Sequence, residues 1–212
     1  MADFQRSGST AQVVIKSVSR CGHAGLYAAA LPKARIVLVI RSPFDQIASA
    51  LRGTTLGKLD GAAAVTGSWT WPETVAHGVT REIFAAISLA EQLAWHWVVH
   101  TKKALDDLEG RDRVKIVCCE PLCANPMEHT GAIFDFACLA MGEQTRRFVR
   151  ESTAGPGSRR YYAVRKNPVE TPSTLAERTF GRGSGADRVD RGTDPRLPGV
   201  SVPRTLYQSL AL

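Results

Sequence analysis

"RIVLVIRSPFDQIAS", residues 35–49, contains the features that decide the expected fold. Its apolar run at residues 35–40 is β-branched and almost uninterrupted, which is typical of a strand buried on both faces of a parallel sheet. Ser42 is well placed as a helix N-cap, Pro43 suits the first helical position, and Asp45 follows Ser42 at the spacing of a capping box. The stretch therefore predicts a strand that leads directly into a helix at the carboxyl edge of a sheet.

The rest of the chain repeats this alternation. Two further apolar runs, "VVIKSV" (13–18) and "VKIVCC" (114–119), predict two more buried strands. Residues 52–78 are rich in Gly and Thr and predict a long, partly ordered loop that covers a site, whereas apolar spacing predicts one amphipathic helix over residues 80–108. Shorter helices are predicted at residues 22–31, 125–142 and 143–152. Strands and helices in alternation predict an α/β fold with a doubly wound parallel sheet and flanking helices.

The composition of the 212 residues is that of an ordinary globular protein, with 44% hydrophobic and 22% charged residues. A formal net charge of +7 suggests an anionic partner, which could be a nucleic acid, an acidic membrane surface or a phosphorylated cofactor. The five cysteines have no zinc-type spacing, so we expect a reducing compartment and no bound metal. The N-terminal residues lack the apolar stretch of a signal peptide, and no segment approaches about 20 apolar residues, so we expect a soluble, cytoplasmic chain without a membrane span.

Arg41 and Ser49 form the first candidate site. Arg41 follows the predicted strand at the edge of the sheet where open α/β folds bind their ligands. Ser49 lies seven residues after Ser42, so it returns to the same face of the helix two turns along. An arginine fork and a hydroxyl beside a helix N-terminus suit a dianionic phosphate. The alternative is that Arg41 pairs with a neighbouring carboxylate and that Ser49 is only a small residue at a helix–sheet contact.

These residues also resemble a known family. Arg-x-Pro (41–43), followed six residues later by Ser49, is similar to the 3′-phosphate-binding segment of sulfotransferases that use 3′-phosphoadenosine 5′-phosphosulfate. Upstream, "VVIKS" resembles the family's strand with its functional lysine, and residues 113–149 resemble its strand, acidic turn and following helices. Residues 152–168 resemble the segment with which carbohydrate-type members close over the nucleotide. The resemblance covers roughly residues 12–172.

The resemblance implies a P-loop-like α/β domain, which could be incomplete, and transfer of a sulfuryl group to a carbohydrate or other small hydroxylated acceptor. It implies that 3′-phosphoadenosine 5′-phosphosulfate is the co-substrate and that Arg41 and Ser49 hold its 3′-phosphate. Lys16 would neutralise charge on the leaving phosphate, and Arg165 would reach the nucleotide from the closing segment. For both of these cations the alternative is a solvated surface residue.

The 5′-phosphosulfate loop of the family has only a partial counterpart. The residues whose sequence is similar to that loop are Arg6, Ser7, Gly8, Ser9 and Thr10. Only "MADFQ" precedes them, which is too short for the usual strand, and "VVIKSV" follows where a helix should be. The segment is predicted to act as the loop or to be a flexible N-terminal tail at 1–11. The chain thus resembles an N-terminally truncated or internally deleted member of the family.

Two other family features are missing. Cytosolic members carry a histidine two residues after the strand lysine, where this chain has Val18. His23, His96 and His100 are each more typical of structural histidines, so the general base stays unassigned. The second missing feature is the helix, introduced by a tryptophan, with which the family usually ends. Residues 173–212 contain no tryptophan, are rich in Gly, Pro and Arg, and predict an irregular, disordered tail after a domain at 12–172.

Three functions stay open on the sequence alone. The first is a sulfotransferase, and the second is an inactive remnant of that fold that binds adenosine bisphosphate or serves as an interaction surface. The missing phosphosulfate loop favours the second. A basic nucleic-acid-binding domain ranks last, because the basic residues are scattered rather than interleaved with exposed aromatics. We therefore expect a small-molecule or carbohydrate partner and no nucleic acid, and make no prediction of oligomeric state.

Overall fold

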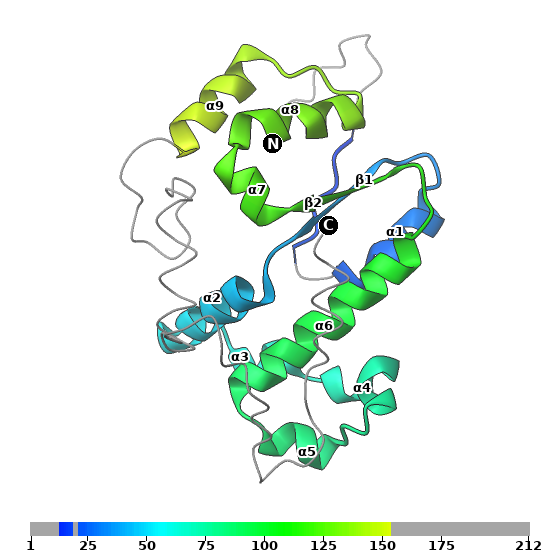
Figure 1. The fold of residues 1–212 in the computed structure, drawn as a ribbon, viewed down its shortest axis with the longest axis vertical. Coiled ribbons are helices and arrows are strands. Elements are labelled where there is room, and N and C mark those ends of the chain that lie inside the picture. Colours follow the sequence, from blue (N-terminus) through cyan, green and yellow to red (C-terminus); the bar gives the residue numbers. More distant parts are fainter. Residues whose placement is uncertain (1–12, 19–20, 154–212) are drawn as a thin grey trace, which may run out of the picture.

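The computed structural model describes residues 13–18 and 21–153, in which helices surround one parallel sheet (Figure 1). β1 (Ile36–Ile40) pairs with β2 (Val114–Cys118) in parallel, with Ile36 opposite Val114 and Ile40 opposite Cys118. These two strands confirm the predictions at 35–40 and 114–119 to within a residue. The α/β class is confirmed in this coarse sense.

Most of the described residues belong to helices. In chain order they are η1 (Cys21–His23), α1 (Ala24–Ala30), α2 (Pro43–Thr55), α3 (Gly61–Val65), η2 (Ser68–Thr70), α4 (Pro72–Ala76), α5 (Arg81–Ala86), α6 (Leu89–Leu108), α7 (Cys119–Ala124), α8 (Pro126–Ala137) and α9 (Glu143–Thr153). The predicted helices at 22–31 and 143–152 are confirmed as α1 and α9. The one predicted at 125–142 ends early, because Cys138 adopts a left-handed conformation with φ of 55° at the C-cap of α8.

The strand predicted at residues 13–18 is not formed. All six residues are exposed, and none of them belongs to a strand. β-branched composition predicted burial, but a strand is buried only where a neighbouring strand and covering helices exist. In the described part of the chain, β1 pairs with β2 alone, so the sheet there is two-stranded rather than doubly wound. The predicted domain boundaries near residues 12 and 172 lie outside the described residues.

The single helix predicted over residues 80–108 is in fact two helices, α5 and α6. The side chain of Ser88 accepts a hydrogen bond from the Glu91 N–H at 3.3 Å, and Glu91 Oε2 accepts one from the Ser88 N–H at 2.8 Å. This reciprocal capping box starts α6 and ends the continuity with α5. The apolar period runs through the break, which is why periodicity alone predicted one helix.

The loop predicted at residues 52–78 is largely helical. It contains the end of α2 and all of α3, η2 and α4. Thr74 is fully buried, and its Oγ1 donates to the carbonyl oxygen of Ser68 at 2.8 Å. Trp69 and Trp71, the two tryptophans of the segment, pack against the apolar core. The segment is therefore part of the folded body rather than a cover over a site.

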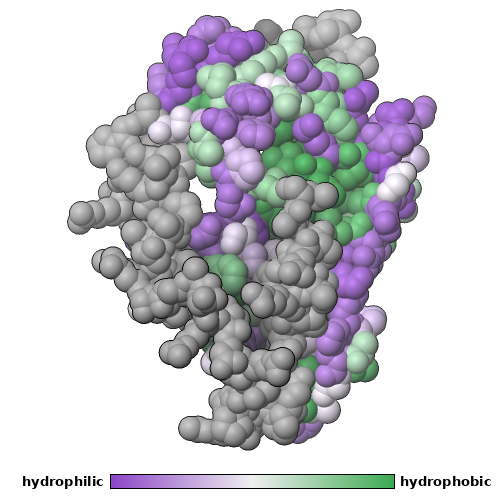
Figure 2. Space-filling model, in the orientation of Figure 1, coloured by the Kyte–Doolittle hydropathy of each residue, from purple (hydrophilic) through white to green (hydrophobic). Residues whose placement is uncertain are grey.

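Two apolar clusters meet on α6. In the first, Leu38 on one face of the sheet packs against Ala28 of α1 and Ala104 of α6. In the second, α6 contributes Trp95 and Val99 to a cluster that also includes residues of α2 and α5. Figure 1 shows α6 crossing the molecule, with α1 beside one half, α3 to α5 around the other, and α7 to α9 beyond the sheet. Hydrophobic side chains remain visible over the sheet in Figure 2.

Candidate functional site

The carboxyl end of β1 leads into α2 as predicted, but the start of this helix is capped differently. Ser42 occupies the N-cap and Pro43 the first helical position, yet the Ser42 side chain makes no capping hydrogen bond. Asp45 does not complete a capping box; it is buried, with 7% exposure. The Ser42 N–H instead donates to Oε1 of Glu120 at 2.7 Å. A carboxylate of the same chain therefore binds at the helix start where we predicted a phosphate.

Glu120 is well placed for this contact. It lies in the first turn of α7, which directly follows β2, and its carboxylate lies beside the partial positive charge at the start of α2. Sequence reasoning did not find the contact, although a signal was present. Arg41 follows β1 and Glu120 lies just after β2, and the carboxyl ends of adjacent parallel strands lie at one edge of a sheet. The register of the two strands therefore brings Ser42, which follows β1, beside Glu120, which follows β2.

Arg41 is held through its backbone carbonyl, and its side chain lies near Asp45 without forming an ion pair with it. The indole Nε1 of Trp97, a residue 5% exposed, donates to the Arg41 carbonyl oxygen at 3.1 Å. Among the described residues, the half-buried Arg41 forms no ion pair. Burial raises the pKa of Asp45; the nearby Arg41 charge opposes this rise, whereas Glu120 adds to it. The direct carboxylate pairing considered as the alternative for Arg41 is therefore absent from the described structure.

A cavity of about 100 Å³ lies between the carboxyl end of β1 and α6. Its polar lining residues are Cys21, Arg41, Gln46, His96, His100 and Thr101. No Asp or Glu belongs to the described residues that line it. These residues come from η1, from the β1–α2 junction and from α6, so no local motif could predict the cavity.

Two histidines on α6 form one wall of this cavity. The ring centroids of His96 and His100 lie 4.2 Å apart, and His96 Nδ1 lies 3.0 Å from Oγ of the buried Ser68. The His100 ring also contacts Trp71, with ring centroids 4.4 Å apart and the planes tilted by 55°. Burial lowers the pKa of His100 to about 4, with His96 and His23 contributing in the same direction, and burial lowers the pKa of His96 as well. Both imidazoles are therefore neutral near pH 7.

Acidification is expected to destabilise the fold through His100. Its pKa of about 4 in the folded chain lies below the ordinary 6.5, so the unfolded chain takes up the proton first as the pH falls. The free energy of unfolding should be highest above pH 6.5 and should fall between pH 6.5 and 4. Because His100 is only half-buried, we expect a loss of about 1–2 kcal/mol rather than the full linkage value.

Urea unfolding near pH 7 and near pH 4.5 measures this loss. His100→Gln should show a smaller difference between the two pH values, whereas His77→Gln, which alters a histidine outside the cavity, should behave like the parent chain. An unchanged pH dependence in His100→Gln would show that other groups cause it.

Only part of the predicted site lies within the described structure. Ser49 is half-buried on α2, two turns after Ser42, but it does not line the cavity. Lys16 lies in the exposed segment 13–18 and not on a strand beside β1. The predicted loop residues at 6–10 and Arg165 lie outside the described residues. The structure thus places Arg41 at the β1–α2 junction and Ser49 two turns along α2, and shows no contact between them and Lys16.

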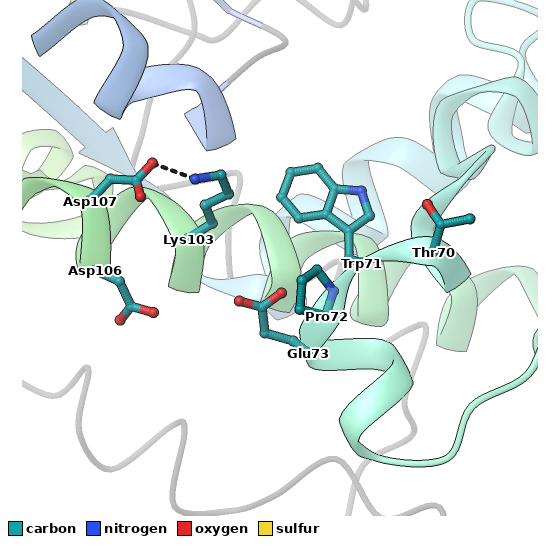
Figure 3. Close-up of a pocket in the computed structure, with 7 residues that line it drawn as sticks. All are labelled: Thr70, Trp71, Pro72, Glu73, Lys103, Asp106 and Asp107. Carbon is teal, nitrogen blue, oxygen red and sulfur yellow. Dashed lines mark hydrogen bonds and ion pairs between the residues drawn. The ribbon is translucent and has the colours of Figure 1, made fainter. Parts of the chain in front are cut away.

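A second hollow, of about 420 Å³, adjoins Trp71 (Figure 3). In this view Lys103, Asp106 and Asp107 of α6 stand opposite Trp71 and Glu73. Lys103 pairs with Asp107 at 2.6 Å, and Asp106 pairs with Lys102 at 2.5 Å. Two of its three carboxylates are therefore already neutralised by lysines of the same helix, and we assign no ligand to it.

No protein-family model, curated protein or solved structure matches this chain. Within residues 13–18 and 21–153, no helix has the length and apolar character needed to cross a bilayer. The same residues contain no group of three or more His, Cys, Asp or Glu side chains arranged to hold a metal ion. The function therefore has to be inferred from the geometry at the carboxyl end of β1.

Proposed function

We propose that this chain is a sulfotransferase that uses 3′-phosphoadenosine 5′-phosphosulfate and binds the 3′-phosphate of that nucleotide beside Arg41 and Ser49. The observation that supports this most is the position of Arg41. It follows β1, directly precedes the helix that carries Ser49, and forms no ion pair with any described residue. A guanidinium fork at this edge of a parallel sheet suits a phosphate. In this proposal β1 and β2 belong to a P-loop-like sheet.

Sulfuryl transfer requires no covalent bond between the protein and the substrate. The bond from sulfur to the leaving phosphate oxygen breaks as the acceptor oxygen forms its bond to sulfur, and a base takes the acceptor's proton. Positioning of the donor and neutralisation of its charge supply most of the rate. Arg41 fixes the nucleotide, and the neutral His96, which lines the same cavity, accepts a proton through Nε2 in the tautomer whose Nδ1–H donates to Ser68 Oγ. The acceptor in this proposal is a carbohydrate or another small hydroxylated molecule.

Calorimetric titration with adenosine 3′,5′-bisphosphate at fixed salt tests the proposal. The parent chain should bind, and Arg41→Ala and Ser49→Ala should each weaken binding about tenfold or more, the value of one lost charge-assisted hydrogen bond. Arg146→Ala is the matched control, because it removes the same charge from the exposed surface of α9. No binding by a folded parent chain, or equal losses in Arg41→Ala and Arg146→Ala, would reject the nucleotide site.

A second candidate is a non-catalytic domain of the same fold that binds the nucleotide or a partner. Two observations favour it: Lys16 lies in an exposed segment, and Glu120 already binds the N-terminal end of α2. The two functions differ in turnover. Incubation with the sulfated donor and a pool of hydroxylated acceptors should release adenosine 3′,5′-bisphosphate if the chain is an enzyme, whereas nucleotide binding without release supports the second candidate.

A further inference from the structure

We infer that the cavity between β1 and α6 is an anion site, which binds a small tetrahedral oxyanion such as sulfate or phosphate. It shares Arg41 and His96 with the proposed transferase site, but His100 and Thr101 also line it and Ser49 does not, so sulfate binding does not require nucleotide binding. A cavity of about 100 Å³ is smaller than the roughly 300 Å³ at which sites for larger organic ligands begin. Its size therefore suits a small ion and not a nucleoside.

The charges of the lining select an anion. Arg41 supplies a cation that forms no ion pair with a described residue, and the described residues that line the cavity include no carboxylate. Thr101 is 6% exposed, and its hydroxyl makes no hydrogen bond to any described residue. Leu38, Trp97 and other apolar residues complete the walls, and such surroundings strengthen hydrogen bonds to a charged ligand.

The packing of His100 turns one nitrogen of its ring into a donor for this cavity. Its Nδ1 is buried without a partner and lies against Gly22, where an added Cβ would be only 2.7 Å away. A buried N–H without a partner is rarer than a buried acceptor without one, so the proton belongs on Nε2. Since Nδ1 is sealed, Nε2–H is the group that can reach a ligand. Gly22 is thus required by the close approach of this ring.

Titration with sodium sulfate, at constant ionic strength maintained with sodium chloride, tests the site by NMR of the five histidine rings. Saturable shifts are expected at His100 and His96, with no comparable shift at His77. Arg41→Ala and His100→Phe should each weaken sulfate binding about tenfold or more, as expected for loss of a charge-assisted hydrogen bond. His77→Gln is the matched control and should bind sulfate like the parent chain. Inorganic phosphate should give the same pattern.

Two results would overturn the inference. One is the absence of a saturable shift at His100 in the folded parent chain, and the other is an equal shift at His77, which indicates general screening by salt. Ser49→Ala separates this site from the nucleotide site, because it should lose adenosine 3′,5′-bisphosphate and retain sulfate. Because Arg41 belongs to both sites, sulfate and the bisphosphate are expected to compete, and the response of Ser49→Ala distinguishes the two sites.

Discussion

Replacing Trp95 with alanine is expected to lower the free energy of unfolding by about 3–5 kcal/mol, the usual cost of deleting a fully buried aromatic side chain. Trp95 is 1% exposed and lies in the larger cluster with Leu93 and Val99 of the same helix. Its ring also packs against His77 in a T-shaped arrangement, with the ring centroids 5.5 Å apart. The free energy of unfolding of a small domain is about 5–15 kcal/mol, so this one change should remove a large part of its stability. Urea unfolding followed by circular dichroism measures the loss.

Trp69→Ala is the matched control for this prediction. Trp69 is only partly buried at the margin of the same cluster, so its removal should cost clearly less, about 1–2 kcal/mol. Equal losses for Trp95→Ala and Trp69→Ala would contradict the central position of Trp95. Trp95→Phe keeps an aromatic ring and should retain a folded chain. Since α6 carries Trp95 next to His96, that variant also shows whether looser packing of the helix disturbs the cavity.

The elements that could be predicted from the sequence are those whose signals are local. β1 and β2 are short β-branched runs, and their composition predicts their positions to within a residue. Pro43 and Pro126 each occupy the first turn of a helix, so the starts of α2 and α8 could be read from the fixed backbone of proline. Such signals need no partner elsewhere in the chain.

The errors occur where a local signal depends on a distant partner. Residues 13–18 have the composition of β1, but no described strand pairs with them. Composition gives the tendency to form a strand and not the presence of a neighbour. Residues 52–78 contain glycines and threonines that predict a loop, yet Trp69 and Trp71 pack against the core and the segment is largely helical. Tertiary packing decides both cases.

The candidate site divides in the same way. Arg41 could be predicted because it follows a strand and precedes a helix in the sequence itself. The role of His100 could not, because it depends on contacts with Gly22 and Trp71, which lie far from it along the chain. Sequence spacing shows that His96 and His100 share a helix face, but not whether that face meets solvent, a core or a cavity.

Glu120→Gln is expected to increase the affinity for adenosine 3′,5′-bisphosphate by about 10- to 100-fold, the effect of about 1.4–2.7 kcal/mol. Glu120 Oε1 accepts a hydrogen bond from the Ser42 N–H at 2.7 Å. This N–H is therefore not free to bind a phosphate at the start of α2, and the negative charge of Glu120 repels the phosphate. Glutamine keeps an oxygen that can accept from Ser42 while it removes the negative charge. The fold should therefore be retained, and the field of Arg41 should act on the phosphate without opposition from this carboxylate.

Calorimetry of the parent chain and of Glu120→Gln, at low and at raised salt, measures the change. Glu128→Gln is the matched control, because Glu128 is an exposed glutamate in the first turn of α8 and its neutralisation should leave the affinity unchanged. An equal gain in both variants would indicate only the change in net charge. Weaker binding by Glu120→Gln would mean that Glu120 orients Arg41 for the nucleotide instead of competing with it. A selective gain in Glu120→Gln would show that the N-terminal end of α2 binds the phosphate and that the Glu120 carboxylate competes with the phosphate for this position.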